Sequence, residues 1–345
     1  MTASVLTGYV IVPLFGVLIC LAPLTTRPTV RFGVRVPPEH ATDAVILRQR
    51  RDYQWRTALV AICATAVVIA VNSRSSGWPS RVILLGEIAV DFGCYWLARR
   101  RIAKVKADES WFAGRRQTVV ADTSWRTDPQ PFPVGWLLPA VAVIAATVVI
   151  GVLRYPQLDP RPSAVSAFGV VGAQVYVTGV WAALLLLVHR ARPDIDTADP
   201  AASLRGYRKA LGAFARGALI LLAGLDASLL LHGLQLWQVA VLPGGTVLVV
   251  LPFVLALVAF LGIAVRAGWE RARTASRTGG ADRDDDRFWK AGLVYVNRDD
   301  PAVLVSARFA FGWTVNLGNR TGWLLVAGFL AVPAGLVIIR FATGS

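Results

Sequence analysis

The chain has 345 residues, 55% of them hydrophobic, and its 36 basic residues outnumber 21 acidic ones to give a formal net charge of +15. So apolar a composition excludes a disordered chain, and three cysteines exclude a disulfide-rich scaffold. The basic charge would suit nucleic acid in a soluble protein, but long apolar stretches explain it better through membrane topology, so no nucleic-acid partner is expected.

Eight apolar stretches are each about long enough to cross a ~30 Å hydrocarbon core as a helix. We predict membrane helices over residues 5–24, 57–73, 81–98, 134–153, 165–189, 210–233, 243–266 and 322–341. The expected fold class is an all-α integral membrane protein, an eight-helix bundle with a small cytoplasmic β-hairpin module. Three parts are expected: a membrane helical domain (1–266) with an interfacial elbow (25–56), a linker and hairpin module (267–321), and the eighth helix with its tail (322–345).

Basic residues concentrate in alternate loops. Of the 36, 31 fall in or beside the segments 25–56, 99–133, 190–209 and 267–321. The other five are Arg74, Arg81, Arg154, Arg161 and Arg340. Because Lys and Arg mark cytoplasmic loops, we expect these segments inside a bacterial plasma membrane, beside its anionic inner leaflet, and both termini outside.

The elbow ends in a basic and aromatic stretch. Arg48, Arg50 and Arg51 precede Tyr53 and Trp55. Guanidinium groups and aromatic rings both suit the lipid headgroup layer, so these arginines are candidate headgroup ligands. A plain juxtamembrane elbow is favoured over a specific lipid or partner site.

Metal and disulfide chemistry are not expected. Cys20, Cys63 and Cys94 all fall inside predicted helices and are interpreted as apolar packing residues. His40 and His189 stand alone in basic surroundings, which does not suggest a metal triad. No motif indicates a cofactor.

Three acidic residues lie inside predicted helices and form the candidate intramembrane polar site. Glu87 and Asp91 share one face of the third helix, and Asp226 lies at a similar depth on the sixth. Acids in a membrane normally face the bundle interior or water, so we predict that the three approach one another. Structural hydrogen bonding and an ion or proton route are equally favoured.

Aspartates precede the hairpin region. Asp282, Asp284, Asp285 and Asp286 lie in the polar stretch 271–287. They lack the ligand spacing of an EF-hand loop, so a solvated linker is favoured over a cation site.

A period of two then predicts strands. Residues 303–317 alternate with an aromatic odd-numbered face, which we expect to be buried. Residues 289–296 form the partner strand, and 297–301 supply the turn. Docking of this hairpin on the protein itself is favoured over docking on a partner. Its candidate interaction residues are Trp289, Tyr295, Asn297, Asp300, Phe309, Phe311, Trp313 and Asn316.

One sequence pattern suggests a family. It comprises Trp289, Gly292, Tyr295, Asn297, Asp300 and Pro301, followed by Gly312, Trp313, Thr314 and Asn316. This C-terminal pattern resembles a module of uncharacterised bacterial multi-pass membrane proteins, and residues 32–37 are also similar to that family, which is loosely allied to Sdp-type immunity membrane proteins. The resemblance implies a bacterial plasma-membrane protein with a recurring cytoplasmic hairpin and no known catalytic residues.

Three function classes remain. The first is a non-enzymatic envelope-associated or regulatory membrane protein that acts through its hairpin. The second is a proton- or ion-coupled transporter that uses the intramembrane carboxylates, although the sequence lacks clear inverted repeats. The third is a membrane enzyme, which the lack of a catalytic motif places last.

Overall fold

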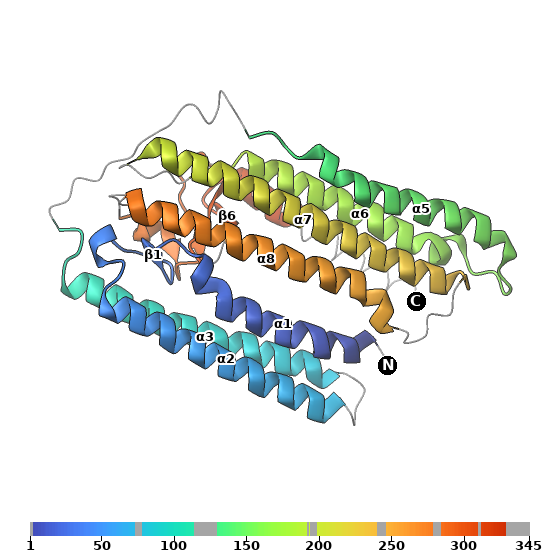
Figure 1. The fold of residues 1–345 in the computed structure, drawn as a ribbon, viewed down its shortest axis with the longest axis horizontal. Helices are drawn as coiled ribbons and strands as arrows, with labels where there is room; N and C mark the ends of the chain where they lie inside the picture. The colour runs from blue at the N-terminus through green and yellow to red at the C-terminus, as the bar shows by residue number, and fades with distance from the viewer. Residues whose placement is uncertain are drawn as a thin grey trace.

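The protein is mostly helical. A computed structural model describes residues 3–72, 78–113, 130–191, 193, 199–239, 246–278, 284–309 and 312–328. Its long helices are α1 (Ala3–Thr25), α2 (Ala44–Asn72), α3 (Trp78–Asp108), α5 (Leu138–Arg154), α6 (Ala164–His189), α7 (Pro200–Leu236) and α8 (Thr246–Thr278) (Figure 1). Residues 320–328 are also helical. Four short 3-10 turns complete the helical part: η1 (Pro38–His40), η2 (Val134–Leu137), η3 (Tyr155–Gln157) and η4 (Asp286–Phe288).

Five of the described helical segments are long and apolar enough to cross a membrane: Ala44–Val71, Val134–Gln157, Ala164–His189, Pro200–Leu236 and Val247–Gly268. Large apolar side chains cover their outer surface, such as Ile62 at 66% exposed and Leu138 at 66%. Hydrocarbon is the solvent that suits such a surface. These features are those of a multi-pass membrane protein.

The remaining three predicted crossings are not among these five segments. In α1 the described apolar part is Ile11–Thr25, which is shorter. Helix α3 carries Glu87 and Asp91 among its apolar residues. Most of the predicted last crossing, residues 322–341, lies outside the described part of the chain.

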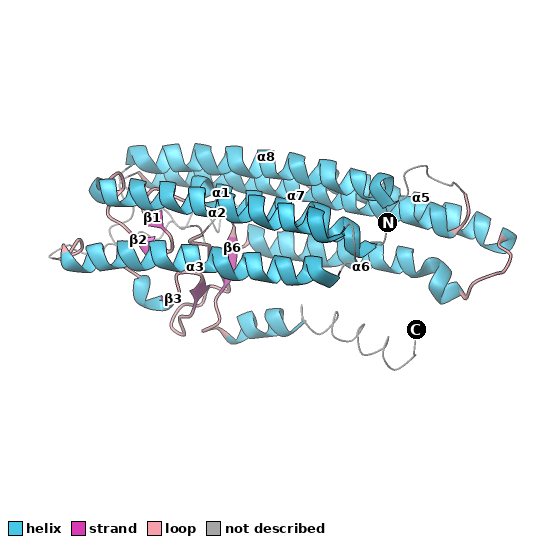
Figure 2. Ribbon diagram, turned by 90° about the horizontal axis from the view of Figure 1, so that it is seen from below, coloured by secondary structure: helices cyan, strands magenta, loops and turns pink. Residues whose placement is uncertain are grey.

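The long helices form two groups. Helices α1, α2 and α3 pack against one another, while α7 packs against α5, α6 and α8. Contacts between α1 and α8 join the groups (Figure 1). Figure 2 shows the short strands gathered toward one end of the bundle, which we call the hairpin end.

Several helices continue beyond the apolar stretches from which they were predicted. Helices α3, α7 and α8 have 31, 37 and 33 residues, or about 46, 56 and 50 Å of length. Their additional turns are rich in Ala, Arg and Lys, which favour helix, although the many charged residues make these turns too polar for hydrocarbon. Likewise α2 begins at Ala44, so the second half of the elbow is continuous with the crossing.

The predicted single hairpin is wrong. Strand β3 (Trp289–Lys290) pairs with β4 (Val294–Tyr295), and β5 (Leu304–Ser306) pairs with β6 (Trp313–Val315). The reason is that each predicted strand contains its own reversal, because Ala291 and Gly292 adopt positive φ within the first. A single parallel bridge between Tyr295 and Asn316 connects the two hairpins.

The predicted burial of the odd-numbered face is also wrong. Leu304, Val305 and Ser306 are all buried, and so is Arg308, at 3% exposed. Trp313 is only partly buried. Alternation of buried and exposed residues requires a long strand with one solvent-exposed face. Both faces of the three-residue β5 are covered.

A third hairpin lies near the N-terminus and meets the others. Strand β1 (Val30–Arg31) pairs with β2 (Val34–Arg35), and its turn has φ of 48° at Phe32 and 72° at Gly33. The tip lies against the tip of the β3–β4 hairpin, because a Cβ added to Gly33 would lie 2.5 Å from the carbonyl oxygen of Gly292. Segments far apart in sequence therefore touch backbone to backbone.

Replacement of Gly33 by Ala should separate these tips. The new Cβ would clash with the backbone of Gly292, and an alanine would have to adopt the left-handed conformation of Gly33. We therefore expect about 1–3 kcal/mol of lost stability, seen as a lower Tm in detergent. Gly86→Ala is the control, since nothing lies within 4 Å of its added Cβ. Equal effects of the two substitutions would contradict the tip-to-tip contact.

Candidate functional site

Six charged side chains, three of each sign, meet beside the hairpin tips. We call them the ion-pair cluster: Arg35, Lys106, Arg308, Asp284, Asp285 and Asp286. Arg308 pairs with both Asp285 and Asp286, and Arg35 Nε lies 3.3 Å from Asp285 Oδ1. Lys106 Nζ lies 2.8 Å from Asp284 Oδ1 and 2.6 Å from Asp286 Oδ2. The prediction of a solvated linker is therefore wrong for these aspartates.

The centre of the cluster is buried and hydrogen-bonded to backbone, while Lys106, Asp284 and Asp286 are partly exposed. Arg35 is 2% exposed and Arg308 3%. The backbone N–H of Arg35 donates to Asp286 Oδ1 at 3.0 Å, and Arg308 Nη1 donates to the backbone carbonyl oxygen of Gly33 at 2.9 Å. The Arg308 guanidinium also lies 4.7 Å above the centre of the Trp289 ring. Such extra bonds are what a buried ion pair needs to offset desolvation.

Electrostatics favour the charged form of Asp286. Burial by itself would raise the pKa of this carboxyl, but the charges and hydrogen bonds of Arg308 and Lys106 outweigh burial and hold the pKa below its ordinary value. Burial lowers the pKa of Arg308, and the nearby aspartates oppose that change. Each charge is thus stabilised by the others.

Aromatic contacts dock the β3–β6 region, residues 284–319, on both helix groups; we call this region the C-terminal module. The Phe309 ring lies 4.8 Å from Tyr95 of α3 and 6.2 Å from Tyr53 of α2, both edge to face. On the other side, Trp313 Nε1 donates to the Tyr207 hydroxyl of α7 at 2.9 Å. The module therefore bridges the two groups at the hairpin end.

The motif residues form a network inside the module. The Asn316 side-chain amide donates to the carbonyl oxygens of Asn297, Asp300 and Ala302 at 2.9, 3.0 and 3.1 Å. Its Oδ1 accepts from the Asn297 N–H at 3.0 Å. The Tyr295 hydroxyl donates to Asp300 Oδ2 at 2.9 Å. Asn316 thus joins the two hairpins.

The candidate interaction residues consequently point largely inward. Trp289, Tyr295 and Asn316 are 6%, 4% and 0% exposed, and Phe309 and Trp313 contact the helices. Phe311 lies outside the described residues. Phe309 and Trp313 thus contact helices of the protein itself.

Glu87 and Asp91 lie at the junction of α1, α2 and α3. Each is 3% exposed, and their four carboxylate oxygens have no hydrogen-bond partner within the described structure. Gly16 makes room for this pair, because an added Cβ would lie 2.8 Å from Glu87 Oε1 and 2.3 Å from the Ala61 Cβ. These two acids do share one site.

Asp226 lies elsewhere, in the α5–α6–α7 group. Thr178 Oγ1 donates to Asp226 Oδ2 at 2.8 Å, and Gln174 Nε2 donates to the Asp226 carbonyl oxygen at 2.9 Å. The prediction that Asp226 meets Glu87 and Asp91 is wrong, because α1 and α8 lie between their helices (Figure 1). Equal depth along a bundle does not determine which helices are neighbours.

The candidate headgroup arginines lie at the start of α2. Arg48 and Arg51 are exposed, and Arg50 is half-buried. Trp55, one turn further along, is 73% exposed. Accessible cationic and aromatic groups at a helix end are suited to a headgroup layer.

Comparison with known proteins gives one match. Residues 298–323 match a family of unknown function (DUF5808). No curated protein and no solved structure shows a significant match to the chain. The matched segment includes Asp300, Trp313 and Asn316, so it covers the second hairpin, its network and its contact with α7.

Sequence reasoning missed the partners of the aspartates. Arg35, Lys106 and Arg308 come from three distant segments, and no local spacing links them. One signal was present in the alternation of 303–317, where Arg308 interrupts an otherwise uncharged run. An arginine inside a strand pattern is costly unless it is paired.

Replacement of Asp286 by Asn should destabilise the hairpin end. The amide keeps the shape but leaves Arg308 and Lys106 less compensated, so we expect a loss of roughly 2–3 kcal/mol at neutral pH. Because the folded pKa is depressed, the stabilisation is present above the unfolded pKa near ~4 and is lost as the pH falls through the lower folded value.

The measurement is Tm in detergent as a function of pH for both proteins. Their difference should shrink as the buffer is acidified below about pH 4. Asp299→Asn provides the control, since Asp299 is an exposed acid of the same module. A pH-independent difference would contradict the electrostatic role.

Proposed function

We propose that the chain is a non-enzymatic multi-pass protein of the bacterial plasma membrane, envelope-associated or regulatory, that acts through its C-terminal module on the cytoplasmic side. All eight predicted helices cross in this proposal, and the elbow contacts the anionic inner leaflet through Arg48, Arg50 and Arg51. The apolar outer surfaces of the described helices and the 31 to 5 division of basic residues support it.

One observation carries the proposal. The module is bound to the first helix group through Lys106 and Phe309 and to the second through Trp313. A protein partner that engages its exposed residues, such as Lys290 and Arg298, would therefore act on both groups at once.

A second candidate function has its own observation. Glu87 and Asp91 are buried together without hydrogen-bond partners in the described structure. Buried acids of this kind can exchange protons or bind cations in a membrane protein. A proton- or ion-coupled transporter is therefore the alternative.

Reporter fusions test the orientation. Fusions after Arg126, Pro200 and Thr278 should report the cytoplasm, and fusions at Ser75, Asp159, Gly244 and the C-terminus should report the outside. The reason is the Lys and Arg bias of the intervening loops. A reversed pattern, or a C-terminus inside, would reject the topology.

Complementation of a strain that lacks the protein, grown under envelope stress, separates the two functions. If the module acts through its surface, charge reversal by Lys290→Glu with Arg298→Glu should abolish rescue, while Glu87→Gln with Asp91→Asn should retain it. Both side chains changed in the first variant are exposed, so expression should not fall. Loss of rescue only in the carboxylate variant would support ion coupling and refute action through the module.

A further inference from the structure

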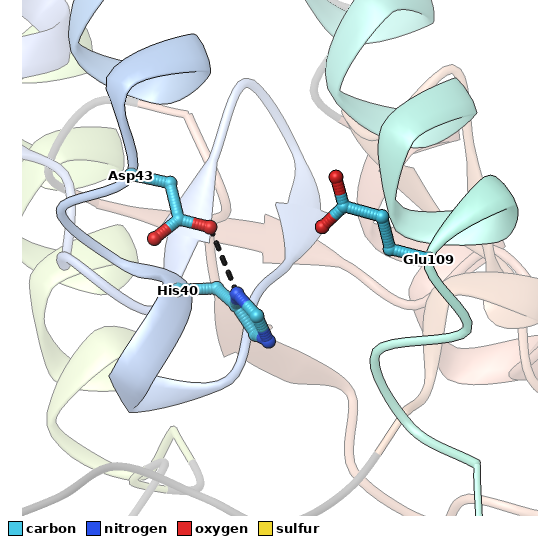
Figure 3. A group of neighbouring side chains, drawn as sticks. All are labelled: His40, Asp43 and Glu109. Atoms are coloured by element: carbon cyan, nitrogen blue, oxygen red, sulfur yellow. Dashed lines mark hydrogen bonds and ion pairs between the residues drawn. The ribbon is translucent and has the colours of Figure 1, made fainter.

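Three side chains with metal-binding atoms meet near the hairpin end. His40 ends η1, Asp43 directly precedes α2, and Glu109 directly follows α3. One ligand atom of each lies within 4.8 Å of the other two. Figure 3 shows the His40 ring between the two carboxylates, with a hydrogen bond of 2.8 Å between Nδ1 and Asp43 Oδ2. His40 is isolated only in the sequence.

A buried tryptophan orients two of the three ligands. The His40 ring stacks on the Trp111 ring, with centroids 4.6 Å apart and planes 9° apart. Trp111 Nε1 donates to Glu109 Oε2 at 2.7 Å, and Trp111 itself is 4% exposed. Outer partners that fix ligand orientation are a regular part of metal sites. One buried side chain therefore contacts both His40 and Glu109.

We propose that His40, Asp43 and Glu109 bind a divalent transition-metal ion of the Zn²⁺ type, with water completing the coordination. One imidazole nitrogen and two carboxylates suit Zn²⁺, whereas Mg²⁺ and Ca²⁺ prefer oxygen ligands alone. The metal would replace the hydrogen in the bond between His40 Nδ1 and Asp43 Oδ2, and the displaced proton would pass to solvent.

The geometry requires small movements of the ligands. Ligands about 2.0 Å from a tetrahedral Zn²⁺ lie roughly 3.3 Å apart, so the group, whose atoms lie within 4.8 Å of one another, must close by at most about 1.5 Å. Glu109 is exposed, and rotation of its side chain can supply this movement. His40 Nδ1 and Asp43 Oδ2, which are 2.8 Å apart, must instead separate by roughly 0.5 Å to reach the same spacing.

Metal binding at this site would stabilise the end of α3. Glu109 immediately follows the helix. The backbone N–H of Trp111 donates to the Lys106 carbonyl oxygen at 3.2 Å. Lys106 in turn pairs with two aspartates of the ion-pair cluster. The ion would thus tie the elbow to the helix end that supports the cluster, and this inference does not rest on the proposed function.

The test uses the full chain, purified in detergent, stripped with chelator and titrated with Zn²⁺ by calorimetry. We expect one equivalent to bind and to raise Tm, because an ion that binds only the folded state stabilises it. Glu109→Gln should weaken binding at least tenfold while preserving the fold, since its side chain is exposed. Trp111→Phe keeps a ring for stacking but loses the N–H, so it should weaken binding by roughly 10- to 100-fold.

Asp108→Asn is the matched control, because this exposed acid adjoins Glu109 but lies outside the group. Its affinity should equal that of the wild type. Unchanged binding in Glu109→Gln, equal weakening in the control, or Mg²⁺ binding as tight as Zn²⁺ would each overturn the proposal. Absorption bands of tetrahedral Co²⁺ that disappear in His40→Ala would support it independently.

Discussion

Burial of the ion-pair cluster is the constraint on which the hairpin end depends. Taking Arg35 and Arg308 out of water costs several kcal/mol each unless opposite charges and hydrogen bonds replace the lost hydration. Their partners come from the C-terminal module, while Lys106 comes from α3. Arg308 pairs within the module, but Arg35 and Lys106 reach the aspartates of the module from two other segments, so the cluster is complete only when the three segments assemble. The cluster therefore specifies a tertiary arrangement as much as it stabilises one.

This arrangement explains how two helix groups hold a common register. Between apolar helices in lipid there is little hydrophobic force to select one relative position. At the hairpin end, however, Tyr95 of α3 donates to the Ala291 carbonyl oxygen and Trp313 donates to Tyr207 of α7. Directional bonds at both sides of one small module fix a position that apolar packing alone would leave adjustable.

The sequence was informative wherever the physical signal was local. Apolar length located the long helices, because hydrocarbon thickness acts on each stretch separately. The prediction ended α3 too early and began α7 too late, because the charged turns at those ends are too polar for hydrocarbon but still favour helix. Strand pairing was poorly predicted, because the reversal at Ala291 and Gly292 was missed. The period of two failed as well, since the strands are too short to have a solvent-exposed face. Likewise, depth along the bundle placed Asp226 with Glu87 although their helices are not neighbours.

The residues that match the family include buried members of the hydrogen-bond network inside the module. Within residues 298–323, Asn316 is fully buried and its side-chain amide donates hydrogen bonds to three carbonyl oxygens. The Asp300 carboxylate accepts a hydrogen bond from the Tyr295 hydroxyl. These residues are needed to join two very short hairpins, which could not persist alone in water. The matched residues therefore determine how the module folds and how it docks on α7.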